Sequence, residues 1–198
     1  MTDRKGFFVA ARAGTLLGPT LTQSEVDGCS AILDAMAGAP IAYAAYALAT
    51  AYLETKHTMM PIHEDGGPSY FFRMYDRKGN RPAVAAELGN TQDGDGVKFH
   101  GRGYVQLTGR GNYQKASIKL GVDMISDPEL ALRDDIAAKV MRLGMTEGWF
   151  TSKKFSSYLP STGVAVSAQF IAARRIINGQ DRAADIASYA MQFQRYLS

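Results

Sequence analysis

The most apolar stretch of the chain predicts a buried central helix. No residue in the range 35–53 is charged, and this range ends directly before Glu54. An uncharged run of this length could suggest a membrane span. Gly38, Pro40 and three tyrosines favour instead a helix over about 41–56 that packs inside the protein, because it is apolar on nearly every face.

Apolar positions at helical spacing predict further helices on both sides of this one. The segment 22–25, Thr-Gln-Ser-Glu, has the form of a capping box and predicts a helix over about 22–36. Apolar residues that recur every three or four positions predict helices over about 134–147, 165–177 and 181–197. We therefore expect a mainly helical protein.

The middle of the chain lacks this periodicity. Segment 58–96 is rich in glycine and proline and predicts a long irregular loop, which is often a functional feature. The run Asp-Gly-Asp-Gly at 93–96 resembles part of a calcium loop but lacks EF-hand spacing, so we predict a turn. Segment 97–113 predicts a short β-ribbon that leads into a helix, and Arg102, between two glycines, indicates a buried charge partner. No linker or repeat interrupts the chain, so we expect a single domain over 1–198.

Composition is that of an ordinary globular protein, since 46% of the 198 residues are hydrophobic. The formal net charge of +3 is spread along the chain, which argues against a nucleic-acid partner and suits weak attraction to an anionic polymer. Cys29 is the only cysteine, so we expect no intrachain disulfide, and its spacing from apolar residues predicts a core position. Arginine interrupts the apolar part of the N-terminal segment, so we expect no signal peptide.

Glu54 is the first candidate for chemistry, because it lies in the last turn of the predicted central helix. The last turn of a buried helix reaches the surface where the interior meets a cleft, and a carboxyl group there loses part of its hydration. This favours the protonated form, which a general acid needs in order to protonate a leaving oxygen. The alternative is a glutamate at a helix end that lies in solvent and has no chemical role.

Glu64 is the second candidate and lies in the loop after Pro61. A loop carboxylate near Glu54 could act as the base that activates water. For inversion at a sugar carbon, the two carboxyl groups should stand roughly 6.5–9.5 Å apart. The neighbouring Asp65 is the less favoured choice of base, and loop acids are often only solvated.

The predicted ribbon supplies candidate sugar-binding groups. In an extended strand, Tyr104, Gln106 and Thr108 share one face, while Val105 and Leu107 share the other. If the apolar pair faces the core, the phenol, amide and hydroxyl line up for hydrogen bonding and stacking on sugar. The alternative is a surface strand with ordinary polar residues.

The segment after the central helix also contains residue types that bind metals. Glu54 and His57 are three positions apart, and His63 and Asp65 follow. No His-Glu-x-x-His motif is present, and His100 is the only further histidine. We therefore expect no metal and keep a metal-dependent peptidase only as an alternative.

Taken together, these segments resemble the lysozyme-like catalytic domain of glycoside hydrolase family 19, in its phage and bacterial endolysin branch. The resemblance spans nearly the whole chain in order and spacing, and GRGYVQLTGRGNY is its most specific part. It is carried by the segments ALATAYLET (47–55), MMPIHEDGG (59–67), LGNTQDGDGVKFHGRGYVQLTGRGNY (88–113) and ARRIING (173–179), with TLTQSEVDGCSAILDAM (20–36) as the lead-in helix.

The resemblance implies a fold, a reaction and roles for individual residues. The implied fold is a mainly α, α+β lysozyme-like structure, with helical lobes and a small antiparallel β-ribbon beside a substrate groove. The implied reaction is hydrolysis, with inversion and no cofactor, of a β-1,4 bond beside an N-acetylated sugar. Glu54 falls on the general acid and Glu64 on the second acidic residue. The positions implied to bind sugar, hold the attacking water or line the cleft are Gln106, Thr108, Asn112 and Asn178.

Three features depart from the family pattern. The residue before the acid is often histidine in this family and is Leu53 here. The chain lacks the disulfides and extra loops of plant-type chitinases. The second carboxylate also follows the first sooner than in those enzymes, so Glu64 is the less secure of the two assignments.

We expect an endolysin of muramidase type that cuts the glycan strands of bacterial peptidoglycan. It would act as a monomer, without stable membrane insertion, and reach the periplasmic wall from the host cytoplasm after holin-type release. A chitinase acting on β-1,4-linked N-acetylglucosamine polymers is the first alternative. A non-catalytic glycan-binding protein is the second, although retention of both carboxylates argues against it.

Overall fold

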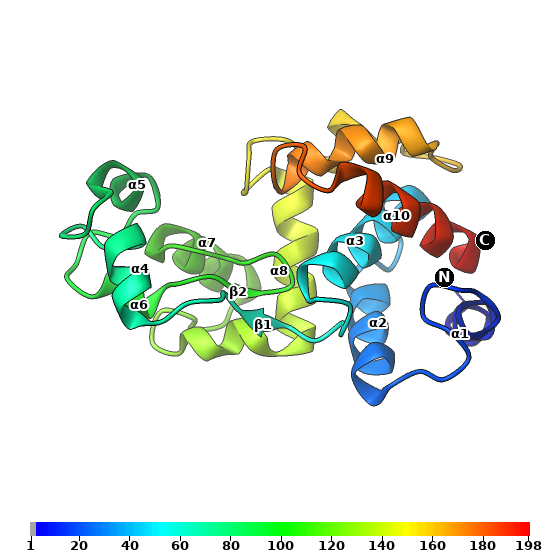
Figure 1. Ribbon diagram of the computed structural model, residues 1–198, viewed down its shortest axis with the longest axis horizontal. Coiled ribbons are helices and arrows are strands. Elements are labelled where there is room, and N and C mark those ends of the chain that lie inside the picture. The colour runs from blue at the N-terminus through cyan, green and yellow to red at the C-terminus, as the bar shows by residue number, and fades with distance from the viewer. Residues whose placement is uncertain (1–2) are drawn as a thin grey trace. The chain divides into compact units, whose positions relative to one another are not determined.

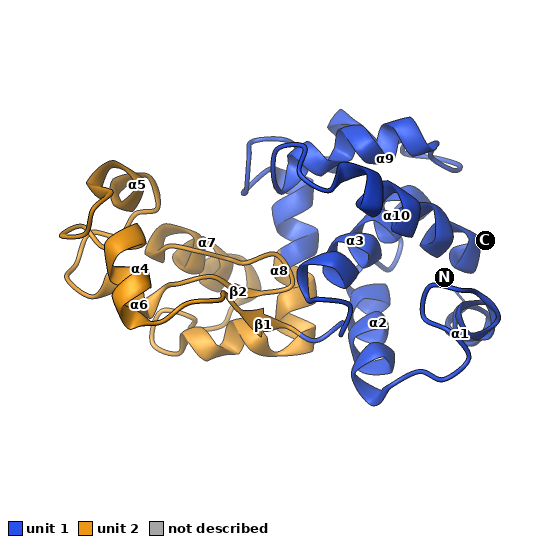
Figure 2. Cartoon of the chain, in the orientation of Figure 1, with its two compact units in different colours: residues 1–60, 141–198 blue, residues 61–140 orange. Residues whose placement is uncertain are grey.

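The computed structural model describes residues 3–198. The chain forms two compact units: unit 1 comprises residues up to 60 together with 141–198, and unit 2 comprises residues 61–140 (Figure 1, Figure 2). Helix α8 (Asp134–Glu147) contributes residues to both units. The single catalytic domain expected over 1–198 stays a prediction.

Helix α3 (Ile41–Glu54) forms the centre of unit 1, as the uncharged stretch predicts. Its residues from Ala44 to Leu53 are all buried, and the hydroxyl of Tyr46 donates a 2.8 Å hydrogen bond to the carbonyl of Ala173. Helix α10 (Ala183–Leu197) packs along α3 in Figure 1. Among residues 3–198, no helix has the length and apolar character needed to cross a membrane. The buried-helix prediction is therefore confirmed.

The other predicted helices of unit 1 are also confirmed. The side chain of Thr22 accepts from the amide of Glu25, and the carboxylate of Glu25 accepts from the amide of Thr22, so the capping box is present. Cys29 is fully buried, as its spacing predicts. The remaining elements of this unit are α1 (Arg4–Ala13), α2 (Gln23–Ala35), η2 (Phe155–Ser157), α9 (Ser167–Ala173) and η3 (Arg174–Ile176).

The expectation of an irregular loop over 58–96 is wrong, because this segment contains three short helices. Pro68 and Pro82 occupy the first positions of two of them, where the missing amide proton costs nothing. The helices of unit 2 are α4 (Pro68–Tyr75), α5 (Pro82–Glu87), α6 (Asp95–Lys98), α7 (Arg110–Leu120) and η1 (Pro128–Leu132).

The expected β-ribbon is present but much shorter than segment 97–113. Strand β1 (Ile62–His63) pairs antiparallel with β2 (Arg102–Gly103), with Ile62 opposite Gly103 and His63 opposite Arg102. A tight turn follows β2, and an isolated bridge joins Arg102 to Leu107. The fold class, mainly helical with a small antiparallel sheet, is confirmed.

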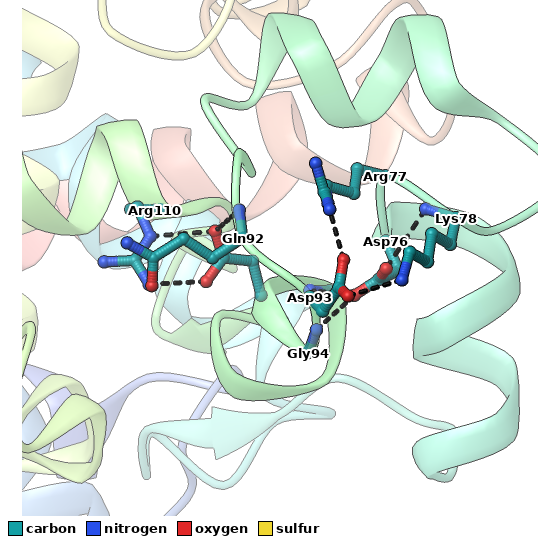
Figure 3. Close-up of polar contacts among 9 residues, drawn as sticks. Asp76, Arg77, Lys78, Gln92, Asp93, Gly94 and Arg110 are labelled. Carbon is teal, nitrogen blue, oxygen red and sulfur yellow. Dashed lines mark hydrogen bonds and ion pairs between the residues drawn. The ribbon is translucent and has the colours of Figure 1, made fainter.

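The run at 93–96 forms a turn that leads into α6, as predicted, and its carboxylates are bound by neighbouring side chains and amides (Figure 3). Asp93 accepts 2.5 Å bonds from both Arg77 and Lys78. Asp95 is 2% exposed and forms a two-pronged ion pair with Arg110, with bonds of 2.8 and 2.6 Å. The buried Asp76 accepts from three backbone amides in this corner. These contacts fix the chain between α4 and α7.

Candidate active site

Glu54 is the last residue of α3 and forms an ion pair that the sequence analysis did not anticipate. Its Oε1 accepts a 2.6 Å bond from Nη1 of Arg174, whose side chain is 3% exposed while that of Glu54 is 23% exposed. Arg174 is anchored in turn by a 2.9 Å bond from its Nε to the carbonyl of Asp181. The ion pair therefore fixes Oε1 of Glu54 against a buried guanidinium, while the side chain as a whole stays partly exposed.

The turn after Glu54 has an unusual backbone. Lys56, His57 and Met59 all have positive φ angles, of 54°, 71° and 57°. Such conformations are costly for residues other than glycine, and they persist only where surrounding contacts impose them. Here the hydroxyl of Thr55 accepts from the amide of Met59, and Gly28 on α2 lets the Met59 carbonyl approach within 2.0 Å of where a Cβ would be. The turn is therefore held by close packing, and it ends α3 at Glu54.

Glu64 follows strand β1 in unit 2, and both of its carboxyl oxygens accept hydrogen bonds. Oε1 accepts a 2.7 Å bond from the hydroxyl of Tyr75, and Oε2 accepts a 3.1 Å bond from the amide of Gly101. The backbone amide of Glu64 also donates to the carbonyl of Gly101 at 2.8 Å. Burial and the bond to Glu64 raise the pKa of Tyr75, so the phenol keeps the proton that it donates.

Gln106 presents its side-chain oxygen beside this carboxylate. Its Nε2 donates to the carbonyls of Ile62 and Gly103, at 3.3 and 3.2 Å, which fixes the orientation of the amide. Its Oε1 is buried and has no hydrogen-bond partner among residues 3–198. The backbone φ of Gln106 is 54°, a strained value of the kind that recurs at functional sites.

Three oxygens meet at the bare Cα of Gly101. A Cβ built on Gly101 would lie 2.9 Å from Oε1 of Gln106, 3.0 Å from Oε2 of Glu64 and 3.1 Å from Oγ1 of Thr108. The hydroxyl of Thr108 donates to the carbonyl of Gln106 at 2.8 Å, so its oxygen can accept from a further group. The missing Cβ of Gly101 therefore lets three side-chain oxygens converge on one face of its backbone, so groups that can accept hydrogen bonds from a water molecule lie next to the candidate base.

Of the predicted site residues, the structure brings Glu64, Gln106 and Thr108 together in unit 2. Asn112 lies on the first turn of α7, and its Nδ2 donates to the carbonyl of Thr108 at 2.8 Å. Glu54 and Asn178 belong to unit 1, where the Asn178 side chain is exposed and accepts from the amide of Gly179. The separation expected between the Glu54 and Glu64 carboxyl groups stays a prediction.

The expected exposed face of Tyr104, Gln106 and Thr108 does not exist. Tyr104 is fully buried, and its hydroxyl donates to Asp134 at 2.7 Å. The residues after Gly103 form a turn in which the positive φ of Gln106 breaks the alternation of a strand. A buried ring offers no surface for stacking on a sugar, so the placement of Tyr104 in a sugar-binding row is corrected.

Arg102 has a charge partner, as the sequence predicts, but that partner is the exposed Glu129 and not a buried group. Its Nη2 lies 2.9 Å from Oε1 of Glu129, and its side chain is almost fully buried. Among residues 3–198, no group of three or more histidine, cysteine or acidic side chains could hold a metal ion. His57 stacks on Tyr52 with ring centroids 4.3 Å apart, and Asp65 is exposed.

Arg174 and Tyr75 are the site residues that sequence reasoning missed. Arg174 stands in the quoted segment ARRIING, but nothing in that pattern shows that it reaches a carboxylate 120 positions earlier in the chain. Tyr75 ends α4, which was expected to be loop. The signal that could have suggested this contact is Pro68 followed by spaced aromatic residues, a pattern that indicates helix α4.

Comparison with known sequences assigns most of the chain to one family. The sequence model of the family described as chitinase class I, a glycoside hydrolase 19 family, matches residues 41–185. The rice protein chitinase 8 (Oryza sativa subsp. japonica) is 42% identical over 40 residues, which are 20% of this chain and 15% of the rice protein.

Comparison with solved structures agrees on the fold. Chitinase C from Streptomyces griseus HUT6037 superposes with a TM-score of 0.55 at 20% identity, over 99% of this chain and 76% of chitinase C. A bacterial family 19 chitinase, reported to differ from the plant enzymes, superposes with a TM-score of 0.55 at 18% identity, over 100% of this chain and 95% of the other. At these identities, the likeness concerns the fold alone.

Proposed function

Because the chain belongs to the chitinase class I family, glycoside hydrolase family 19, we propose that it hydrolyses β-1,4 bonds beside N-acetylated sugars, with inversion at the anomeric carbon. The observation that carries this proposal is the meeting of three side-chain oxygens, including one of Glu64, at the bare Cα of Gly101. The reaction needs a water molecule beside a base on one face of the sugar and an acid beside the leaving oxygen.

Glu64 takes the part of the base. A water molecule bound to this group of oxygens would donate one hydrogen to Glu64 and the other to Gln106 or Thr108, which orients its lone pair for attack. The bonds from Tyr75 and Gly101 keep the carboxylate in place while it takes up the proton. Asp65 is exposed, whereas an oxygen of Glu64 belongs to the group at Gly101, which supports Glu64 as the base.

Glu54 takes the part of the acid. Arg174 binds Oε1 and so directs Oε2 away from the guanidinium, where it can donate a proton to a leaving oxygen. As that proton leaves, Arg174 stabilises the carboxylate that forms. Gln106, Thr108, Asn112 and Asn178 are proposed to contact sugar or water.

Two substrates are candidates, and different observations support them. Chitin is supported by the relatives, which are named chitinases. Peptidoglycan glycan strands are supported by the net charge of +3, and by an open cavity of about 510 Å³ in unit 2 whose lining includes Phe72 and Arg73. Arg73 is exposed and lines this cavity, so its guanidinium could receive a carboxylate of the peptide stems that chitin lacks. On this second candidate, the protein acts as an endolysin and reaches the periplasmic wall from the host cytoplasm by holin-type release.

The substrate is tested by mass spectrometry of the reducing ends released from purified peptidoglycan and from chitin oligomers by the same preparation. Release from chitin alone identifies a chitinase, and release of muropeptides with new sugar reducing ends identifies the endolysin. Glu54→Gln should release neither, while Glu87→Gln, which changes an exposed glutamate at the end of α5, is the matched control. Soluble peptides without new reducing ends would indicate a peptidase and overturn the proposal.

A further inference from the structure

The rings of His63 and His100 lie beside the backbone that holds Glu64. His63 directly precedes Glu64, and His100 directly precedes Gly101. Glu64 and Gly101 are joined by two hydrogen bonds, one from the Glu64 amide at 2.8 Å and one to its carboxylate at 3.1 Å. Any contact between the two histidines therefore ties together the two chain segments that set the position of the Glu64 carboxylate.

Three contacts connect the histidine rings to each other and to their surroundings. Nδ1 of His100 lies 2.7 Å from the carbonyl oxygen of Val97. Nε2 of His100 lies 3.0 Å from Nδ1 of His63. Nε2 of His63 lies 3.3 Å from Oε2 of Glu129.

Two placements of the ring protons satisfy all three contacts when Glu129 is ionised, one with the positive charge on His63 and one with it on His100. His100 stacks on the apolar ring of Phe71, and the guanidinium of Arg102 donates to its carbonyl, so these surroundings favour the placement with a neutral His100. The Val97 carbonyl can only accept, so Nδ1 of His100 carries a proton, and a neutral His100 then has a lone pair on Nε2. Nδ1 of His63 must therefore donate to His100. The Glu129 carboxylate also accepts only, so Nε2 of His63 must carry a proton as well. His63 is thus an imidazolium and His100 a neutral imidazole.

The charged groups around the pair agree with this placement. From β2, the buried Arg102 donates to Oε1 of Glu129 at 3.0 and 2.9 Å, and the other oxygen of Glu129 faces His63. From α4, the apolar ring of Phe71 stacks on His100 at 4.3 Å. Burial, together with the charges of Arg102 and His63, lowers the pKa of His100 despite its bond to Val97 and the charge of Glu129.

We propose that His63, in its imidazolium form, is a positioning residue that holds the Glu64 carboxylate by bridging neutral His100 and ionised Glu129. This inference rests on the proposed function of Glu64 as the base. Loss of a proton from His63 leaves a lone pair facing either His100 or Glu129, so the bridge opens. A second proton on His100 opens it too, because two N–H groups then face each other. The rate of hydrolysis therefore depends on pH through groups that never touch the substrate.

The proton placement is tested without substrate, by the ring-nitrogen chemical shifts of the ¹⁵N-labelled protein across a pH titration. The chain has three histidines, so the spectra are simple, and the single variants His57→Gln, His63→Gln and His100→Gln assign them. In the pH range where the enzyme is active, we expect both His63 nitrogens to be protonated and His100 to be neutral with its proton on Nδ1. A neutral His63, or a His100 that carries its proton on Nε2, in that range overturns the inference.

The consequence for catalysis is tested by the pH profile of kcat. We expect the pH at which His63 loses its proton to coincide with one midpoint on the alkaline side of the wild-type profile. His63→Gln, which cannot titrate, should lack that midpoint and lower kcat by roughly 10-fold with KM nearly unchanged, because a misplaced base loses rate without losing binding. Glu129→Gln should move the midpoint to lower pH, since an amide can donate to a neutral His63.

The results separate this inference from the proposed function. If His63→Gln shows the wild-type profile while Glu64→Gln is inactive, the positioning role is refuted and the base stands. If Glu64→Gln keeps the wild-type rate, the proposed function of Glu64 fails, while the nitrogen shifts still decide whether the bridge exists.

Discussion

Tyr75 donates a 2.7 Å hydrogen bond to one oxygen of Glu64, and the amide of Gly101 donates to the other at 3.1 Å. A carboxylate with both oxygens bound keeps one orientation, which a base needs if it is to meet a water molecule at a defined point. The sequence placed Glu64 in a loop, where acids are often only solvated. Glu64 is also partly buried, whereas its neighbour Asp65 is exposed.

Removal of the hydroxyl group of Tyr75 should slow the reaction more than it destabilises the fold. Tyr75→Phe keeps the ring and loses the donor to Glu64, so we expect kcat to fall by roughly 10-fold with a similar KM. Steady-state kinetics on the identified substrate measure this. Tyr70→Phe, which changes another tyrosine on the same helix and leaves the bond from Tyr75 to Glu64 in place, is the control. Equal kinetics for Tyr75→Phe and wild type would argue against orientation of the base by Tyr75.

A methyl group on Gly101 should block the proposed water position. Gly101→Ala would put a Cβ within 2.9–3.1 Å of the three oxygens, where it excludes water. The φ of Gly101 is outside the left-handed region, so the backbone accepts alanine. We expect kcat to fall by roughly 100-fold, with circular dichroism unchanged. Gly67→Ala, at a glycine with nothing within 4 Å of the added Cβ, is the matched control and should keep its activity.

The ion pair between Asp95 and Arg110 should be a main support of unit 2. Asp95→Asn leaves the partly buried guanidinium of Arg110 without its carboxylate, which costs roughly 1.5–3 kcal/mol at neutral pH, and urea unfolding measures the change. Burial alone would raise the pKa of Asp95, but the bonds from Arg110 and Gln92 outweigh it, so the pKa of Asp95 is lowered.

The sign of that pKa shift gives a pH dependence. A carboxyl group with a lowered folded-state pKa stabilises the fold above its unfolded value of 3.8, and this contribution is lost as the pH falls through the folded value. The difference in stability between wild type and Asp95→Asn should therefore be full at pH 6–7 and shrink below about pH 4. A difference that stays constant down to pH 2 would contradict the assignment. EDTA should not change the stability, because Arg77, Lys78 and Arg110 already bind the carboxylates of Asp93 and Asp95.

The elements that the sequence predicts well are those specified by local signals. The capping box at Thr22 and Glu25 and the uncharged run before Glu54 define α2 and α3 to within about two residues. Each signal lies within a single helix, so it can be recognised in the sequence without knowledge of the rest of the fold.

The features that the sequence predicts poorly are very short helices and contacts between residues that are far apart in the chain. Helix α6 has four residues, too few for a periodic pattern to show. The buried position of Tyr104 follows from a turn in which Gln106 has positive φ, a conformation that its residue type does not indicate. The pairing of Arg174 with Glu54 joins residues 120 positions apart, and no local pattern reports such a contact.

The anomeric configuration of the first products tests the central claim most directly. Time-resolved proton NMR on the identified substrate records the anomer released by wild type, with Glu54→Gln and Glu64→Gln measured beside it. Inversion by an acid and a water-activating base predicts α-anomers from the β-linked chain, and release slowed by about 100-fold or more in both variants. First-formed β-anomers, or near wild-type release by either variant, would contradict it.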